Sequence, residues 1–314
     1  MYIKIGIFSL VLILLALAGC SHQESVQTAF IIPEKDLIPE GMAYDPATKT
    51  FFVSSVAKRK IITFSLSGKA EDFISSGQDG IGEVLGMKVD PRKQQLWACS
   101  NTKGDTAMSV VHQFDIATRK LIRKYELTTT AETHLFNDLV IIDSGVYITD
   151  SDFDAVYRIK PGEDHLEIFL KCPDLHYCNG ITTSLKGDHL MVSASSGVFS
   201  IDLYSRKLRK VNFPNYLVFG FDGLYGYNKS FIGIQNTTFP VSVNQFHWDN
   251  EEKEIERADN LVTNHPLFDT PTTGVIVDDW FYFIANSQLG NFDGAKILKP
   301  EDLREIYILK VKLN

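Results

Sequence analysis

One pattern of residues returns six times after Ile38, and no other feature of this chain limits its possible folds as strongly. Each unit opens with a two-residue motif, continues through an apolar strand that ends in small polar residues, and closes with an alternating strand. The openings are Glu40-Gly41, Leu85-Gly86, Asn137-Asp138, Asn179-Gly180, Asp222-Gly223 and Thr273-Gly274. Successive openings lie 42 to 52 residues apart, which is the length of one four-stranded propeller blade.

The strands of the six units have the residue types of half-buried β-structure. Residues 51–55, 96–100 and 146–150 align with one another, and β-branched and aromatic side chains are frequent in them. We therefore predict an all-β fold, a six-bladed β-propeller with four-stranded antiparallel blades around a central channel. Residues 26–32 precede the first unit, and we predict that they supply the outer strand of the last blade and close the ring.

The first residues have the character of an export signal. A single basic residue, Lys4, precedes an apolar run over residues 5–18 that is short for a membrane-spanning helix. The run ends in Leu17-Ala18-Gly19-Cys20, which resembles the lipobox of bacterial lipoproteins, where the cysteine is lipidated. An ordinary secretory signal or an uncleaved anchor is the alternative.

This resemblance implies a place in the cell envelope. Ser21 after the cysteine fits the outer-membrane sorting pattern of Gram-negative lipoproteins, so we expect a lipid anchor at Cys20 in the outer membrane and a domain that faces the periplasm. The expected divisions are a signal peptide over residues 1–19, a lipidated tether over residues 20–28 and the propeller domain over residues 29–314.

The net charge and the cysteines bear on the binding partners, disulfides and metal sites that we expect. The net charge of -8 argues against nucleic acid as a partner, because phosphate binding needs a basic face. In an oxidising compartment Cys172 and Cys178 either form a disulfide or remain buried free thiols, and the sequence leaves both open. No Cys/His spacing indicates a zinc site. We expect a monomer.

The chemistry of the chain is concentrated at the blade openings. The first strand of a propeller blade lines the channel, so the opening residues should meet at one mouth of it. Four of these residues carry oxygen donors, namely Glu40, Asn137, Asn179 and Asp222. An all-oxygen set of this kind suits a hard cation; we expect Ca²⁺, with another divalent ion as the alternative. Each motif alone is also a common turn signal, but their recurrence in register favours the metal site.

The same positions carry a resemblance to a known family. Pro39-Glu40-Gly41-Met42, Asn137-Asp138, Asn179-Gly180-Ile181 and Asp222-Gly223-Leu224 resemble the senescence marker protein/gluconolactonase/paraoxonase group of six-bladed propellers. That resemblance implies that Glu40, Asn137, Asn179 and Asp222 hold a catalytic divalent cation, and that Asp222 also acts as general base. Two positions depart from the family: Leu135 stands where sugar lactonases carry an arginine, and Leu85 where paraoxonase-like members carry a catalytic histidine.

Further side chains are candidates for the same site. His134 lies three residues before Asn137 and is a second candidate for a catalytic group, although a lone histidine is more often a surface or packed residue. The predicted substrate pocket consists of Leu85, Leu135, Gln235, Asn236 and Asn286.

The leading functional hypothesis is a calcium-dependent hydrolase of lactones or esters in the cell envelope, in which the cation polarises the carbonyl. Because two leucines replace polar groups, we expect a modestly apolar lactone as substrate. The alternative is a non-catalytic propeller that binds an envelope component and uses calcium as a structural ion. No G-x-S-x-G elbow, P-loop, dinucleotide fingerprint or H-E-x-x-H motif occurs.

Overall fold

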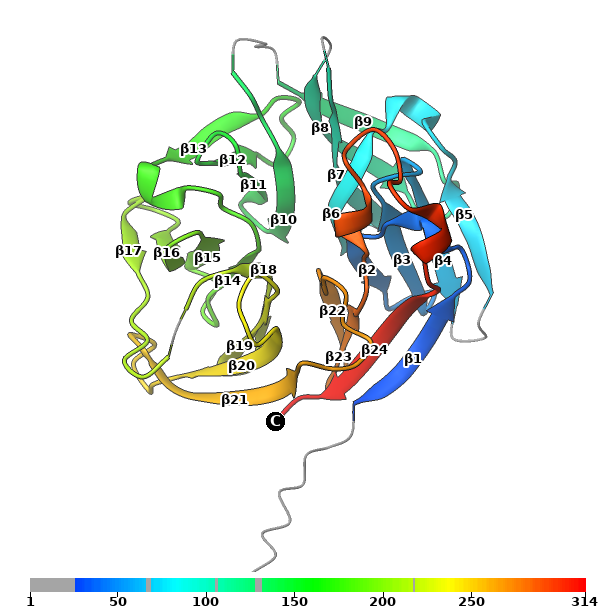
Figure 1. Ribbon diagram of the computed structural model, residues 1–314. Coiled ribbons are helices and arrows are strands. Elements are labelled where there is room, and N and C mark those ends of the chain that lie inside the picture. Colours follow the sequence, from blue (N-terminus) through cyan, green and yellow to red (C-terminus); the bar gives the residue numbers. More distant parts are fainter. Residues whose placement is uncertain (1–25, 66–68, 105–106, 128–131, 217) are drawn as a thin grey trace, which may run out of the picture.

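The computed structural model describes residues 26–65, 69–104, 107–127, 132–216 and 218–314. In these residues six sheets of four antiparallel strands stand in a ring around a central channel (Figure 1). The predicted six-bladed β-propeller is therefore confirmed. The predicted signal peptide and the lipidation site Cys20 lie outside the described residues.

Each of the first five blades consists of four consecutive strands, with the first strand innermost. Blade 1 contains β2 (Met42–Asp45), β3 (Thr50–Ser55), β4 (Lys60–Ser65) and β5 (Ala70–Ile74). Blade 2 contains β6 (Glu83–Asp90), β7 (Gln95–Thr102), β8 (Met108–Asp115) and β9 (Leu121–Glu126). Blade 3 contains β10 (Phe136–Ile142), β11 (Gly145–Asp150), β12 (Ala155–Ile159) and β13 (Glu167–Lys171).

The remaining blades follow the same plan until the ring closes. Blade 4 contains β14 (Ile181–Thr183), β15 (His189–Ala194), β16 (Gly197–Asp202) and β17 (Leu208–Lys210). Blade 5 contains β18 (Phe221–Tyr227), β19 (Ser230–Gln235), β20 (Ser242–Trp248) and β21 (Ile255–Thr263). Blade 6 contains β22 (Gly274–Val277), β23 (Trp280–Ile284), β24 (Ile306–Lys312) and β1 (Gln27–Ile32).

Blade 6 joins the two ends of the described chain. Strand β1 pairs antiparallel with β24, from Gln27 opposite Lys310 to Ile32 opposite Ile306 (Figure 1). The predicted closure by residues 26–32 is thus confirmed. Because the outermost strand of this blade comes from the start of the domain, the ring cannot open without breaking that pairing.

Helical structure is confined to short 3-10 turns in the described residues. They are η1 (Lys35–Leu37), η2 (Gln78–Gly80), η3 (Pro173–Leu175), η4 (Leu289–Asn291) and η5 (Pro300–Asp302). Within the described ranges, none of these turns approaches the length and apolar character of a membrane-crossing helix.

The hydrophobic core lies between neighbouring blades. Both faces of a blade are covered, so the second strands read as nearly continuous apolar runs. In the interface between blades 6 and 1, for example, Ile32, Phe51 and Ile284 pack in one buried cluster. Phe30 of β1 places its ring 5.0 Å from that of Phe51, which ties the closing strand to the first blade.

Glycines at the openings allow the inner strands to approach one another. A Cβ atom at Gly41 would lie 1.9 Å from the carbonyl oxygen of Leu85 in the next blade. One at Gly86 would lie 2.6 Å from the carbonyl oxygen of Asn137. Five of the six openings have glycine as their second residue, and Asp138 is the exception. A side chain larger than hydrogen therefore enters this crowded ring at one position of the six.

Candidate functional site

The opening residues lie at one end of the channel because every inner strand starts there. The pairing of β6, β10 and β18 with their second strands is interrupted by an irregularity at the opening, between Val84 and Met87, Phe136 and Leu139, and Phe221 and Leu224. Leu85, Asn137 and Asp222 stand in these β-bulges. A bulge re-aims a side chain relative to the regular pleat. Glu40 and Asn179 lie two residues before β2 and β14, and Thr273 lies directly before β22.

Three of the four predicted metal ligands present buried oxygen atoms that have no hydrogen-bond partner among the described residues. They are Glu40 Oε2, Asn179 Oδ1 and Asp222 Oδ1. A buried polar atom left without a partner costs about 1–3 kcal/mol, and more when it is charged. Folding would not repeat this cost at three neighbouring positions without compensation, so the oxygens fit a site that receives a cation.

The buried surroundings of Glu40 and Asp222 disfavour the charged forms of both carboxyl groups. Burial raises the pKa of Glu40 well above its ordinary value, and the negative charges of Asp222 and Asp138 raise it further. Burial also raises the pKa of Asp222 to about 6, although interactions with the side-chain amides of Asn179 and Asn236 oppose the rise. A bound divalent cation would favour the charged forms of both carboxylates.

Asn137 is held with its amide in a fixed orientation. Its Nδ2 donates a hydrogen bond to Ser151 Oγ at 3.1 Å, and Ser151 in turn donates to the carbonyl oxygen of Cys178. With the nitrogen engaged, the amide oxygen remains for a cation. Outer hydrogen bonds of this kind orient metal ligands in known sites.

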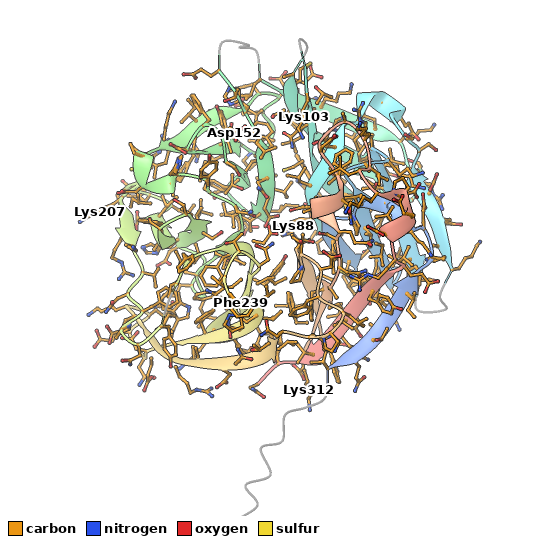
Figure 2. The ribbon with its side chains drawn as sticks, in the orientation of Figure 1. Lys88, Lys103, Asp152, Lys207, Phe239 and Lys312 are labelled. Atoms are coloured by element: carbon orange, nitrogen blue, oxygen red, sulfur yellow. The ribbon has the colours of Figure 1, made fainter. Side chains whose placement is uncertain are left out.

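An ion pair in the channel was missed by the sequence reasoning. Lys88 Nζ lies 3.0 Å from Asp138 Oδ1, and the Asp138 side chain is 2 % exposed. The same ammonium group lies 5.5 Å from the centre of the Tyr225 ring. Figure 2 shows Lys88 near the centre of the ring, where the inner strands face one another. The sequence does contain one indication of this ion pair: Asp138 occupies the position that is glycine in every other blade opening.

Counting the ionised groups of this region indicates the charge that the site can neutralise. Lys88 offsets one of the three carboxylates Glu40, Asp138 and Asp222, which interact electrostatically with one another. Two negative charges remain when all four groups are ionised. A buried net charge is costly unless it is paired, and a divalent cation would balance it.

His134 is paired with a buried carboxylate. Its Nδ1 lies 2.6 Å from Asp150 Oδ2, and the backbone N–H of Leu135 donates to Asp150 Oδ1 at 2.9 Å. Burial raises the pKa of Asp150, and its contacts with Leu135 and His134 oppose that rise. The histidine precedes β10 and so lies at the same end as Asn137, but its hydrogen bond goes to Asp150 rather than to an oxygen-donor residue of the candidate metal site.

The predicted pocket residues divide into two groups. Asn236 joins the site, because its Nδ2 donates to Asp222 Oδ2 at 2.5 Å and to the carbonyl oxygen of Pro271 at 3.0 Å. Gln235 and Asn286 use their amide groups locally: Gln235 donates to the carbonyl oxygen of Phe219, and Asn286 binds backbone groups of Glu305 and Tyr307. Leu85 is buried and Leu135 is partly exposed.

The three cysteines in the described part of the chain, Cys99, Cys172 and Cys178, are free thiols. Of the two alternatives left open by the sequence, the structure contains the unpaired one. Cys178 donates from Sγ to the carbonyl oxygens of Asp150 and Ala155 at 3.3 and 3.4 Å. Burial raises its thiol pKa to about 12, so it has little tendency to react.

The donor chemistry of the site is unusual for a metal centre. No group of three or more His, Cys, Asp or Glu side chains able to hold a metal occurs in the described ranges. The four oxygen-donor residues comprise two carboxylates and two amides. Carbonyl and carboxylate oxygens suit Ca²⁺ or another hard divalent ion better than zinc or copper.

The fold is shared with enzymes of different activities. A gluconolactonase from Xanthomonas campestris has a TM-score of 0.61 and 14% sequence identity, with 90% of this chain and 87% of that one covered. A PQQ-bound aldose sugar dehydrogenase from Streptomyces coelicolor has a TM-score of 0.62 and 13% identity, with coverage of 92% and 98%. A catalytically inactive virginiamycin B lyase from Staphylococcus aureus has a TM-score of 0.59 and 12% identity, with coverage of 92% and 99%.

No protein-family model and no curated protein matches the sequence. At 12–14% identity the structural matches establish the propeller fold alone. Since one fold hosts many chemistries, function has to be argued from the site.

Proposed function

We propose that the protein is a divalent-metal-dependent hydrolase of lactones or esters that acts at the blade-opening mouth of the channel. The observation that carries this proposal is the set of three buried, unpartnered oxygens on Glu40, Asn179 and Asp222. With Asn137 they would hold the cation, for which calcium is the best chemical fit. A gluconolactonase is among the proteins that share this fold.

When bound, the cation would polarise the substrate carbonyl and stabilise the negative charge that develops on its oxygen. Asp222 would accept a proton from the attacking water as general base, with Asn236 holding its second carboxylate oxygen in place. His134, oriented by Asp150 through its Nδ1, is a second group able to accept a proton at the same mouth. The protein therefore supplies two bases around one proposed electrophilic site.

The apolar positions bear on the substrate. Leu85 stands in a β-bulge at the mouth, and Leu135 comes just before β10. Neither side chain can hydrogen-bond a sugar hydroxyl group. We infer a lactone or ester of modest polarity rather than a sugar acid lactone.

The proposal places this hydrolase in the cell envelope. It would work as a monomer, anchored to the outer membrane through lipid on Cys20 and facing the periplasm. Its net charge of -8 fits a small-molecule substrate and disfavours a nucleic-acid partner.

The test is hydrolysis of a panel of aliphatic lactones, sugar lactones and aryl esters by the purified protein. Each substrate is measured with calcium, with chelator, and with the variants Asp222→Asn and Asp143→Asn. Asp143 is an exposed carboxylate beyond the opposite end of β10 and serves as the matched control. We expect turnover of apolar lactones that is lost with chelator and with Asp222→Asn and kept in Asp143→Asn. Silence across the panel would reject the hydrolase in favour of a binding propeller, and turnover of sugar lactones alone would reject the proposed substrate class.

A further inference from the structure

A cavity opens on the face of the ring opposite the candidate cation site, between blades 2 and 3. It has a volume of about 570 Å³, which is within the usual range for small-molecule sites, roughly 300–1,000 Å³. Its lining comes from the last residues of β6 and β10, from β7, β8 and β9, from the start of β11, and from the end of β12 with the turn after it. Most of these segments lie at the strand ends away from the blade openings, so this groove is separate from the candidate cation site.

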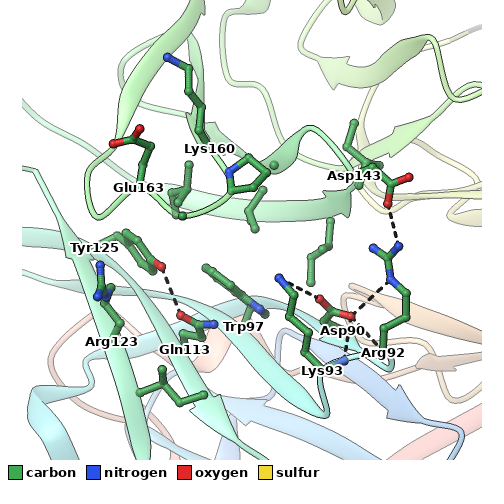
Figure 3. Close-up of a pocket in the computed structure, with 18 residues that line it drawn as sticks. Asp90, Arg92, Lys93, Trp97, Gln113, Arg123, Tyr125, Asp143, Lys160 and Glu163 are labelled. Atoms are coloured by element: carbon green, nitrogen blue, oxygen red, sulfur yellow. Dashed lines mark hydrogen bonds and ion pairs between the residues drawn. The ribbon is translucent and has the colours of Figure 1, made fainter.

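The groove has an aromatic platform. The rings of Trp97 and Tyr125 stack with their centroids 5.5 Å apart and their planes 19° from parallel. The hydroxyl of Tyr125 donates to Gln113 Oε1 at 3.2 Å, and Gln113 Nε2 donates to Gln95 Oε1 at 2.8 Å. Figure 3 shows Trp97, Tyr125 and Gln113 side by side along the groove. These bonds hold the platform in one orientation before any ligand arrives.

Aliphatic side chains complete the walls, among them Ile122, Ile141 and Ile159. The platform residues belong to the buried cluster between blades 2 and 3. A flat or extended apolar group would therefore find a preformed surface here, and a preformed surface lowers the entropic cost of binding.

The charges around the opening are unequally paired. Arg92 is neutralised by Asp143 at 2.7 Å, whereas Lys93 only approaches Asp90, at 4.0 Å. Arg123, two residues before Tyr125, forms no ion pair with any residue in the described ranges. Its guanidinium group is thus a cation at the rim that the protein itself leaves to solvent or to a ligand.

Trp97 adds a donor without an acceptor. The side chain is 5 % exposed, and its indole Nε1 has no hydrogen-bond partner in the described part of the chain. Tryptophan N–H groups normally find a partner when buried. The nitrogen has almost no accessible surface, so a ligand oxygen would reach it only if the surrounding side chains moved.

We propose that this groove is a binding site for an amphipathic organic carboxylate, an acid with a flat aromatic or a short aliphatic body. The body would pack against the aliphatic walls and the small exposed parts of Trp97 and Tyr125, and the carboxylate would pair with the Arg123 guanidinium at the rim. Binding at this site requires neither the cation nor any hydrolytic activity, so its test is independent of the test of the proposed function.

The test uses 2-naphthoate, its neutral amide and hexanoate as probes in calorimetric titrations of the purified protein. We expect saturable binding of both acids. Arg123→Gln should weaken the binding of naphthoate at least about fivefold, the effect of losing one partly screened charge pair, and leave the amide unchanged. Arg209→Gln, in blade 4, is the matched control because Arg209 is also an exposed arginine on a strand.

A second measurement reports directly on the platform. The indole N–H resonance of Trp97 is assigned with Trp97→Phe, and it should shift on titration with naphthoate, while those of Trp248 and Trp280 stay in place. Absence of saturable binding up to millimolar probe would overturn the proposal. Equal affinity for the acid and the amide, or an equal loss in both arginine variants, would overturn it as well.

Discussion

Removing the ammonium group of Lys88 should lower the free energy of unfolding, because a buried carboxylate in the channel would lose its partner. In Lys88→Met, Asp138 would remain 2 % exposed and would lose the partner that now lies 3.0 Å away. Breaking a buried ion pair from one side costs about 3–5 kcal/mol, because it leaves an uncompensated buried charge. A quarter of the Lys88 side chain is exposed, so we expect the lower end of that range, about 3 kcal/mol.

The assay is thermal unfolding in chelator, where no divalent cation contributes. A loss of about 3 kcal/mol corresponds to a decrease in Tm of roughly 5 °C for a domain of this size, because the unfolding entropy is about 2.1 cal/mol/K per residue. Adding Asp138→Asn to the variant removes the orphaned charge and should recover most of the loss. Lys58→Met, which breaks an ion pair in which both partners are about 40% exposed, should cost about 1 kcal/mol or less. An unchanged Tm for Lys88→Met, or a double variant no more stable than the single one, would refute the reasoning.

Three other predictions follow from the burial of particular side chains. Burial and the nearby Lys124 lower the pKa of His112 to about 4. The free energy of unfolding should therefore be highest above about pH 6.5 and should fall by up to about 3 kcal/mol as the pH drops towards 4. Urea unfolding at several pH values should show this decrease in the unmodified protein and a smaller one in His112→Gln. A thiol reagent should label Cys172 in the folded protein while Cys99 and Cys178 react only after unfolding, and a mass lower by that of two hydrogens would instead reveal a disulfide. Phe30→Ala in the closing strand should cost about 3 kcal/mol of unfolding free energy, and a cost below about 1 kcal/mol would show that closure depends little on this contact.

The fold could be predicted because the repeat encodes it six times. Each unit on its own is ambiguous, but the regular spacing of the openings requires one blade per unit. The extra apolar segment before Glu40 then has one place to pair, beside the last blade. The β-bulges at the openings could not be predicted, because Asp-Gly and Asn-Asp are equally typical of turns.

The residues of the candidate site could be predicted from the sequence only where they belong to the repeated motif. The four oxygen-donor positions recur in register, whereas Lys88 lies 50 residues from its partner Asp138 and belongs to no repeated motif. The pairing of His134 with Asp150 joins a loop to the end of a neighbouring strand, and this contact depends on the register of β10 and β11. The groove beside Trp97 is formed by many strand ends of two blades, so no local sequence pattern predicts it.

Calorimetric titration of the metal-free protein with calcium is the decisive experiment for the proposed cation site. We expect one saturable site per chain in the unmodified protein, which is lost in Asp222→Asn and in Glu40→Gln and retained in Asp143→Asn. Absence of calcium binding, or binding that persists unchanged in both ligand variants, would contradict a cation at the blade openings.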